Sequence, residues 1–289
     1  MTITIAKKSG IKRIAAAVLA AATLISVAAC GSGNSTSVSD SLNTTKGKTT
    51  TVTVGVCAGP YGDMVKKVIA PLLKEDGFEL KTKLFNDYVQ PNKALASGSI
   101  QANLFQHGNY LKKFTADNNL DLTSLGQTPT LGLAFTPRNT SPLRASRTVP
   151  PCPSRTMLEP GTFSRRASAA GLGEAQGRGR CHQGTVDDIA SNPKNLKIKT
   201  IDAAQLARSL DTVDVALVPG NYSWAAKLDP SSALALEKQD DGVIEVFVVR
   251  TQDVDSDFGK AVKKLLVSQK FKDAIAKSEF KDFGKPTTW

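Results

Sequence analysis

The sequence predicts an α/β fold with mixed, mostly parallel sheets. Short runs rich in β-branched and apolar residues alternate with amphipathic helical stretches, which is the order that a mostly parallel sheet requires. The 289 residues contain 40% hydrophobic and 22% charged residues, which fits one large or two modest globular domains. In such folds, ligands are expected at the carboxyl ends of strands or between domains.

The first elements of the folded body are a strand and an amphipathic helix. Residues 49–60 alternate, are rich in Val and Thr, and end in a Gly-Pro turn, so they are expected to form a strand. Residues 61–77 carry an apolar stripe at helical spacing, and Gly77 is the expected end of this helix. The elements expected next are a strand at 78–85, a short helix at 92–98, a strand at 102–106, a helix at 108–118 and a buried strand at 130–135.

Strands and helices alternate again in the C-terminal part. The expected elements are a strand at 196–202, a helix at 203–210, a strand at 214–220, a helix at 221–228 and a buried strand at 243–250. One long amphipathic stretch at 257–277 completes the chain. This order repeats the strand–helix pattern of the first part.

The N-terminus is expected to be a processing signal. A basic head is followed by an apolar run at 14–27, which is shorter than the roughly 20 apolar residues of a membrane span and fits a secretory signal. The run ends in Val-Ala-Ala-Cys, which resembles a lipobox, so residues 1–29 are predicted to be removed and Cys30 to be lipid-modified. The alternative is an ordinary signal peptide with a chance cysteine. The Gly/Ser/Thr/Asn-rich residues 30–49 are predicted to be a flexible tether, with the protein outside the cell membrane and anchored to it by lipid.

The net charge of +11 does not predict a nucleic-acid partner. It is concentrated in the basic head, which has no acid, and in residues 137–184, which hold eight arginines against two glutamates. The remaining chain is nearly neutral, and Phe163 is the only aromatic residue in the arginine-rich stretch that could stack on a base. We therefore expect no nucleic acid among the partners.

Catalytic patterns are missing from the sequence. His107 and His182 are the only histidines, and there is no nucleophile elbow, phosphate-binding glycine loop or metal-spaced Cys/His cluster. The protein is expected not to be an enzyme and to need no cofactor or metal. Cys57 is expected to be a small buried residue, the alternative being a disulfide with Cys152 or Cys181.

A long motif resembles a known family. FNDYVQPNKALASGSIQANLFQHGNYL, residues 85–111, is similar to the signature of the NlpA-type, methionine-binding lipoproteins that feed ABC importers, and residues 192–198 and 203–230 match in the same order. The resemblance implies a two-lobed, periplasmic-binding-protein-like fold with an interlobe ligand cleft. It also implies L-methionine or a related amino acid as ligand and the permease of an ABC transporter as partner. The expected lobes are 50–130 for lobe 1 and 131–243 for lobe 2, with 244–289 returning to lobe 1.

The resemblance also implies five ligand-binding residues. They are Tyr88 of the NDY motif, Phe105 and His107 of FQH, Tyr110, and Asn221 of GNY. Aromatic walls suit a thioether or aliphatic side chain, while a histidine and an asparagine can bond the head groups of a zwitterion. Taken singly, these residues have ordinary alternatives: a core position for Phe105, surface aromatics for the two tyrosines, and a helix cap for His107.

The sequence departs from the family pattern in two places. A family asparagine near the last long strand falls at Glu245, where an acid would repel a ligand carboxylate unless it is neutralised or turned away. A family arginine that pairs with the carboxylate has no matching motif here. These departures put strict methionine specificity in doubt, and another small apolar amino acid or a short peptide is the alternative ligand.

Residues 137–184 have the right length to replace the family region that carries this arginine motif, but their composition is aberrant. They contain no lysine and are crowded with arginine and proline, as expected of a GC-rich gene read out of frame. When the codons are read in shifted frames, they permit peptide sequences similar to those of the family. One is GATVSVPNDA, which ends near Leu158, and the other is SNLARSL, from Leu158 to Arg165. We interpret this stretch as the product of compensating frameshifts. Pro150, Pro151 and Pro153 are expected to block a central strand, so a damaged second lobe, weak binding or a non-functional copy is predicted.

Overall fold

The computed structural model describes residues 42–137, 155–158, 174–175, 189–191, 196–237 and 239–289. The predicted signal peptide, the lipid-attachment residue Cys30, most of residues 137–184 and the cysteines at 152 and 181 lie outside these ranges. Within them, no helix has both the length and the apolar character needed to cross a bilayer.

The first sheet has five strands in the order β2-β1-β3-β12-β4. The strands are β1 (Thr50–Cys57), β2 (Phe78–Phe85), β3 (Ala102–His107), β4 (Leu122–Gln127) and β12 (Glu245–Arg250). Strands β2, β1 and β3 are parallel, whereas β12 runs antiparallel to both of its neighbours. The sheet is therefore mixed and mostly parallel, and its second-to-last strand comes from the C-terminal part of the chain.

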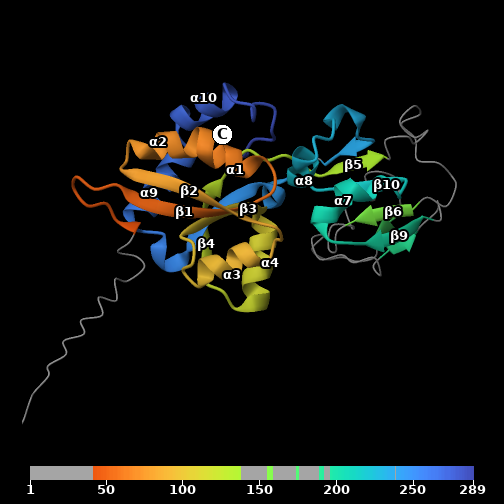
Figure 1. Ribbon diagram of the computed structural model, residues 1–289, viewed down its shortest axis with the longest axis horizontal. Coiled ribbons are helices and arrows are strands. Elements are labelled where there is room, and N and C mark those ends of the chain that lie inside the picture. The colour runs from red at the N-terminus through yellow and green to blue at the C-terminus, as the bar shows by residue number, and fades with distance from the viewer. Residues whose placement is uncertain (1–41, 138–154, 159–173, 176–188, 192–195, 238) are drawn as a thin grey trace, which may run out of the picture. The chain divides into compact units, whose positions relative to one another are not determined.

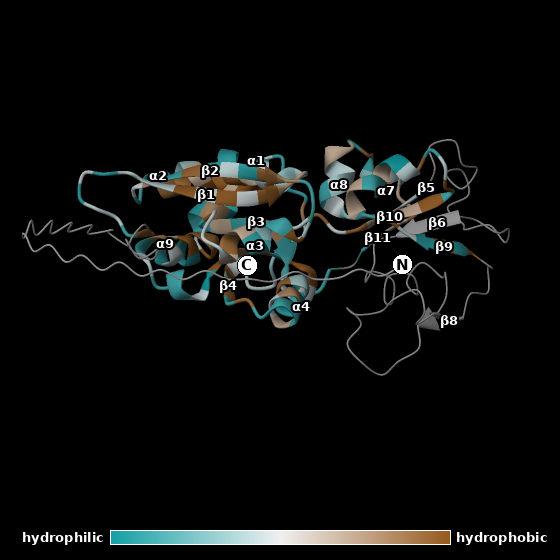
Figure 2. Ribbon diagram, turned by 60° about the horizontal axis from the view of Figure 1, so that its bottom comes forward, coloured by the Kyte–Doolittle hydropathy of each residue, from teal (hydrophilic) through white to brown (hydrophobic). Residues whose placement is uncertain are grey.

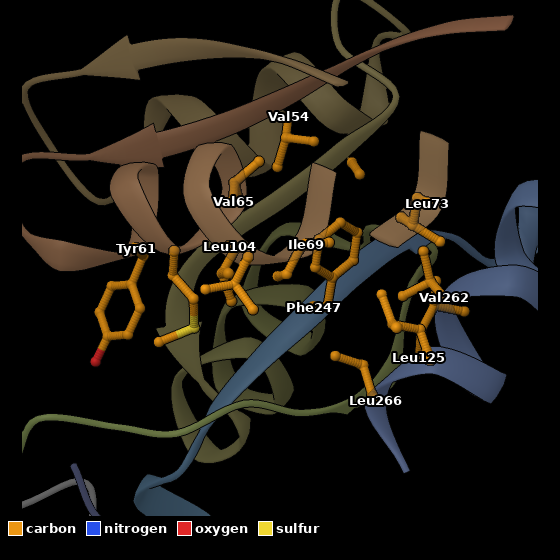
Figure 3. Close-up of a cluster of buried hydrophobic side chains, with 14 of the residues drawn as sticks. Val54, Tyr61, Val65, Ile69, Leu73, Leu104, Leu125, Phe247, Val262 and Leu266 are labelled. Atoms are coloured by element: carbon orange, nitrogen blue, oxygen red, sulfur yellow. The ribbon is translucent and has the colours of Figure 1, made fainter. Parts of the chain in front are cut away.

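Helices cover both faces of this sheet (Figure 1). One layer consists of α1 (Pro60–Met64), a π-helical segment (Val65–Ile69), α2 (Ala70–Lys74), α9 (Asp257–Leu266) and α10 (Gln269–Ala276). The other consists of α3 (Gln90–Ala96) and α4 (Gly108–Asn118). Figure 3 shows Ile69, Leu104 and Phe247 meeting in the core between the first layer and the sheet.

Alternation along the strands decides which core each residue joins. Phe247 and Val249 belong to the cluster under the first layer, whereas Val246 and Val248 pack with residues under α3 and α4. Successive strand residues point to opposite faces, so a strand covered on both faces is mostly apolar along its length. In β1 the last four residues, 54–57, are all buried, and Figure 2 shows brown, hydrophobic segments on this strand.

The second sheet has the order β11-β5-β10-β6-β9. Its strands are β5 (Ala134–Pro137), β6 (Arg155–Leu158), β9 (Lys197–Thr200), β10 (Val215–Val218) and β11 (Ala235–Leu236). Helices α7 (Ala203–Ser209) and α8 (Gly220–Ala225) contribute Leu206 and Tyr222 to a core with Ala216 and Val218 of β10. Strands β7 (Glu174–Ala175) and β8 (Ile189–Ser191) pair in a separate antiparallel ribbon.

The expected proline block of a central strand is wrong for residues 155–158. Strand β6 lies between β10 and β9 and runs parallel to both. Pro150, Pro151 and Pro153 all precede its first residue in the sequence, so none of them removes a hydrogen-bond donor from the paired segment. A strand therefore forms inside the stretch with aberrant composition.

Three other elements differ from the sequence-based expectation. The strand expected at 130–135 begins only at Ala134, because residues 128–133 form the connection from the first sheet to the second. Strand β4 was not expected, because LTSLGQ has no apolar alternation. The expected single stretch at 257–277 is two helices, because the Ser268 side chain accepts the backbone N–H of Phe271 and starts a new helix.

Residues 42–49 do not behave as the flexible tether that was predicted for 30–49. Leu42 is fully buried in the first core. The backbone N–H and the hydroxyl of Thr44 both donate to Asp257 Oδ2, at 2.9 and 2.8 Å, and Asp257 N–H donates to the side chain of Asn43 at 3.0 Å. These bonds fasten the segment to the start of α9.

Candidate functional site

The predicted site residues lie at the end of strand β3 and in the loop and helix starts that follow other strands. Tyr88 follows β2, Phe105 and His107 lie on β3, and Tyr110 lies in the first turn of α4. Asn221 lies in the first turn of α8, directly after β10 of the second sheet. In α/β folds, carboxyl ends of parallel strands share one edge of a sheet, which explains why residues far apart in sequence converge here.

Four aromatic side chains form a cluster, which we call the aromatic cluster: Tyr88, Phe105, Tyr110 and Tyr222. The ring centroid of Tyr88 lies 6.1 Å from Phe105, 6.2 Å from Tyr110 and 5.5 Å from Tyr222, and Phe105 lies 6.3 Å from Tyr110. Phe105 and Tyr222 are buried, whereas the other two are half-buried. These spacings suit edge-to-face and tilted packing of rings around an apolar group.

Asn221 joins the two sheets through both ends of its amide. The Tyr88 hydroxyl donates to Asn221 Oδ1 at 2.8 Å, and Asn221 Nδ2 donates to the carbonyl of Ala58 at 2.9 Å. The neighbouring Gly59 has a φ of 134°, and a Cβ there would lie 2.6 Å from the Cβ of Asn221. Glycine is therefore required at 59 both by backbone conformation and by the close approach of α8.

His107 is held in one orientation by the helix that follows it. Its Nδ1 accepts the backbone N–H of Tyr110 at 3.1 Å, so the helix-cap alternative is realised. The neutral ring then carries its proton on Nε2. The Tyr110 hydroxyl donates to the carbonyl of Tyr88 at 2.9 Å, which fastens the first turn of α4 to the loop after β2.

Buried amides support the strand that carries Phe105 and His107. Asn92 of α3 bonds Gln106 in both directions, at 2.8 and 2.7 Å, and accepts from Asn103 Nδ2 at 2.9 Å. All three are essentially inaccessible to solvent. A satisfied buried network of this kind gives α3 and β3 one defined position.

Two ionisable groups near these strand ends are shifted toward their neutral forms. Burial, and next the charge of Glu237, raises the pKa of Glu245 to about 8. Burial, and next the charge of Glu245, raises the pKa of the Cys57 thiol, whose Sγ donates to the carbonyl of Asp87 at 3.2 Å. Glu245 is therefore mainly protonated at neutral pH, and a neutral carboxyl does not repel an anionic group. Cys57 is buried as expected.

The structure brings all five predicted residues together and adds others. Tyr222, Gly59 and the carbonyl of Ala58 were not predicted. Tyr222 follows Asn221 in the GNY motif, so its aromatic side chain could have indicated that it belongs to the site. Gly59 and the Ala58 carbonyl contribute through the backbone, and the residue types alone do not reveal such a contribution.

In the described ranges, no group of three or more His, Cys, Asp or Glu side chains could hold a metal ion.

Comparisons with known proteins identify a family to which this chain is similar. A model described as NlpA lipoprotein matches residues 52–144 and 168–288, so the unmatched residues 145–167 fall within the stretch of aberrant composition. The probable D-methionine-binding lipoprotein MetQ of Vibrio cholerae is 33% identical over 226 residues, covering 74% of this chain and 80% of that one. The methionine-binding lipoprotein MetQ of Bacillus subtilis is 30% identical over 259 residues, covering 87% and 90%.

Solved structures resemble the fold at similar identity. A nutrient binding protein from Burkholderia cenocepacia bound to methionine has a TM-score of 0.71 and 32% identity, and the match covers 80% of this chain and 97% of that one. The substrate binding protein of a methionine transporter from Streptococcus pneumoniae has a TM-score of 0.69 and 31% identity, covering 79% and 93%.

Proposed function

Since the chain belongs to the NlpA lipoprotein family, we propose that it captures methionine or a related amino acid outside the cell membrane and delivers it to the permease of an ABC importer. The protein acts by binding and release and carries out no covalent chemistry. Relatives that match most of this chain are named as methionine-binding lipoproteins, which supports this class of ligand.

The observation that carries the proposal is the bond between Tyr88 and Asn221. It joins the loop after β2 to the start of α8, and its donor Tyr88 packs against Phe105 and Tyr222 of the aromatic cluster. Aromatic rings favour the polarisable sulfur of a thioether by about 0.3–1.5 kcal/mol. His107 and Asn221 supply polar groups for the two charged ends of an amino acid. We therefore assign Tyr88, Phe105, His107, Tyr110 and Asn221 to the ligand site.

Ligand capture would take place between two lobes that close around the bound molecule. Residues 50–130 and 244–289 form one lobe and residues 131–243 the other. Closure of such lobes around a bound molecule is a hinge motion of a few connecting residues. Residues 128–133 and 237–244 connect the two sheets in this chain, so they are the proposed hinge.

Membrane attachment is the second part of the proposal. Acylation of Cys30 would hold the protein at the membrane near its permease, since each buried methylene of the acyl chain contributes about 0.8 kcal/mol. Metabolic labelling with a fatty-acid analogue tests this step. Label is expected on the full chain and absent from a Cys30→Ala variant.

A ligand panel tests the binding function. Thermal unfolding of the purified chain from residue 30 onward is measured with L-methionine, D-methionine, methionine sulfoxide, leucine, glycine and a Met-Met dipeptide. Methionine is expected to raise the melting temperature most, because its side chain fits the aromatic cluster, and glycine is expected to have no effect. A larger shift with leucine or the dipeptide would identify another apolar amino acid or a short peptide as the ligand instead.

A further inference from the structure

Helix α8 belongs to the core of the second sheet, yet three of its residues approach the first core or the connection that leads to it. One of them, Asn221, bonds Tyr88 and the Ala58 carbonyl in the candidate site. The other two, Gly220 and Trp224, lie outside the aromatic cluster, and the proposed function gives them no role.

Trp224 packs against the C-terminal tail, by which we mean residues 277–289, the part of the chain that follows α10. Its ring centroid lies 5.4 Å from that of Phe283, with the two rings edge to face, and 6.3 Å from that of Phe280. Phe280 and Phe283 are buried in the first core, and their centroids are 5.5 Å apart. The half-buried ring of Trp224 therefore joins α8 to the first core by aromatic packing.

The C-terminal tail is also paired with the connection between the two sheets. Thr130 and Gly284 exchange two backbone hydrogen bonds, each 2.9 Å long. The start of α8 touches the same connection, because a Cβ at Gly220 would lie only 2.1 Å from the carbonyl oxygen of Leu131. The tail, the proposed hinge and α8 therefore meet in one place.

Helix α8 is short enough for this contact to affect the candidate site. It has six residues, and Asn221 and Trp224 are three positions apart, so their side chains are neighbours on one side of the helix. A hydrogen-bonded helix of this length moves as a rigid body. The packing of Trp224 on the tail therefore restricts where Asn221 can lie relative to Tyr88.

We propose that Trp224 is a positioning residue for ligand binding: its packing on Phe280 and Phe283 holds α8 in the arrangement in which Asn221 bonds Tyr88. The inference rests on the proposed amino-acid-binding function. Trp224 raises the affinity without touching the ligand, because the apparent dissociation constant increases as the competent arrangement becomes less populated. Loss of the aromatic contact makes that arrangement rarer and weakens binding.

Replacement of Trp224 tests the proposal. Trp224→Ala is expected to raise the dissociation constant for L-methionine about 10-fold, which corresponds to about 1.4 kcal/mol. Trp224→Phe keeps an aromatic ring against the tail and is expected to restore most of the affinity. Titration of L-methionine labelled with ¹³C at its methyl group, followed by NMR, measures the constants even when binding is weak. Unchanged affinity in Trp224→Ala would overturn the proposal.

Trp289→Ala is the matched control, because it truncates the other tryptophan of the chain on the same tail. Trp289 packs against Phe271 of α10, with ring centroids 5.6 Å apart, and the ammonium group of Lys272 lies over its ring. Its removal is expected to lower stability in urea unfolding and to leave the affinity unchanged. Equal losses of affinity in the two alanine variants would show a general effect of stability and would contradict a positioning role.

A double-mutant cycle tests whether both sides of the contact act together. Phe283→Leu removes the ring from the tail but keeps an apolar side chain in the first core. It is expected to weaken binding, and the combination with Trp224→Ala is expected to weaken it no further than Trp224→Ala alone. Fully additive losses would mean that the two residues act independently, and the proposed contact would then be wrong.

Tryptophan fluorescence follows the contact in a chain that keeps it. In Trp289→Phe, Trp224 is the only tryptophan. Saturation with L-methionine is expected to shift its emission to shorter wavelength, because the ligand increases the population in which the ring is packed against the tail. Emission that does not change on saturation would contradict the proposal.

Failure of the two proposals can be told apart. If the original chain binds methionine and Trp224→Ala binds it equally well, the proposed function stands and this inference is wrong. If the original chain binds no amino acid, the proposed function is wrong and this inference with it.

Discussion

Asn221 is the residue whose two bonds connect the sheets, and its removal tests the ligand site. Asn221→Ala leaves the Tyr88 hydroxyl and the Ala58 carbonyl without this partner, and a buried unsatisfied group costs about 1–3 kcal/mol. We expect the dissociation constant for methionine to rise at least about 10-fold by calorimetry.

The matched control is Asn118→Ala, at the exposed end of α4, which is expected to bind as the original chain does. Equal affinity of the Asn221 variant and this control would exclude Asn221 from the site.

The raised pKa of Glu245 predicts how the stability of the ligand-free protein depends on pH. Its pKa rises from the ordinary 4.5 to about 8 on folding, so the folded state favours the protonated form. The contribution to stability is full below pH 4.5 and is lost progressively as the pH rises to 8. Glutamine cannot ionise, so Glu245→Gln should raise the free energy of unfolding by about 3 kcal/mol at pH 7.

Urea unfolding at pH 4.5 and pH 7 measures this effect. The gain is expected at pH 7 and should largely disappear at pH 4.5. A variant that is less stable than the original chain at pH 7 would show that the carboxylate is stabilised in the fold.

At the scale of elements, α3 is positioned on β3 by amides rather than by apolar packing alone. Asn92→Ala removes three of the bonds to these amides, so that Gln106 Oε1 and Asn103 Nδ2 lose the partner seen here and only the bond from Gln106 Nε2 to Asn103 Oδ1 at 3.1 Å is kept. The free energy of unfolding should fall by about 2–4 kcal/mol in chemical denaturation. Lys93→Ala, on the exposed face of the same helix, is the control and should change it by less than about 0.5 kcal/mol. Similar losses in both variants would contradict a specific role for the amides.

Element positions could be predicted where the pattern is local. Residues 78–85 and 108–118 form the expected strand and helix, because a period of two or of 3.6 residues is visible in the side chains themselves. Strand β4 could not be predicted, because its polar residues gain their place from pairing with β12. The break at Ser268 could have been predicted from its capping role, because serine is among the preferred N-cap residues.

At the scale of the whole molecule, the second sheet contains the stretch with aberrant composition. Strand β6 pairs with β10 and β9, yet the arginine that the resemblance implies as the partner of the ligand carboxylate has no matching motif in this stretch. Restoring the in-frame sequence over residues 137–184 should tighten methionine binding at least about 10-fold. The restored arginine would form a charge-assisted hydrogen bond with the ligand carboxylate, and such a bond contributes about 1.5–3 kcal/mol. Micromolar or tighter binding by the original chain would contradict a damaged second lobe.

The gene provides the direct test of the frameshift hypothesis. The nucleotide sequence across codons 130–190 is expected to contain compensating insertions or deletions. Clean DNA that specifies this peptide in a working transporter would make the hypothesis wrong.

The sequence by itself determined the class of fold, the order of most strands and helices, and the family, because these depend on side-chain periodicity and on motifs that are contiguous in the chain. It also named the five residues of the candidate site through one such motif and its GNY partner. Only the tertiary structure decided that Tyr88 bonds Asn221, that Leu42 is buried, and that burial raises the pKa of Glu245 to about 8. Burial and hydrogen bonding between residues more than a hundred positions apart depend on how the sheets and helices pack, and no local pattern of residues encodes that packing.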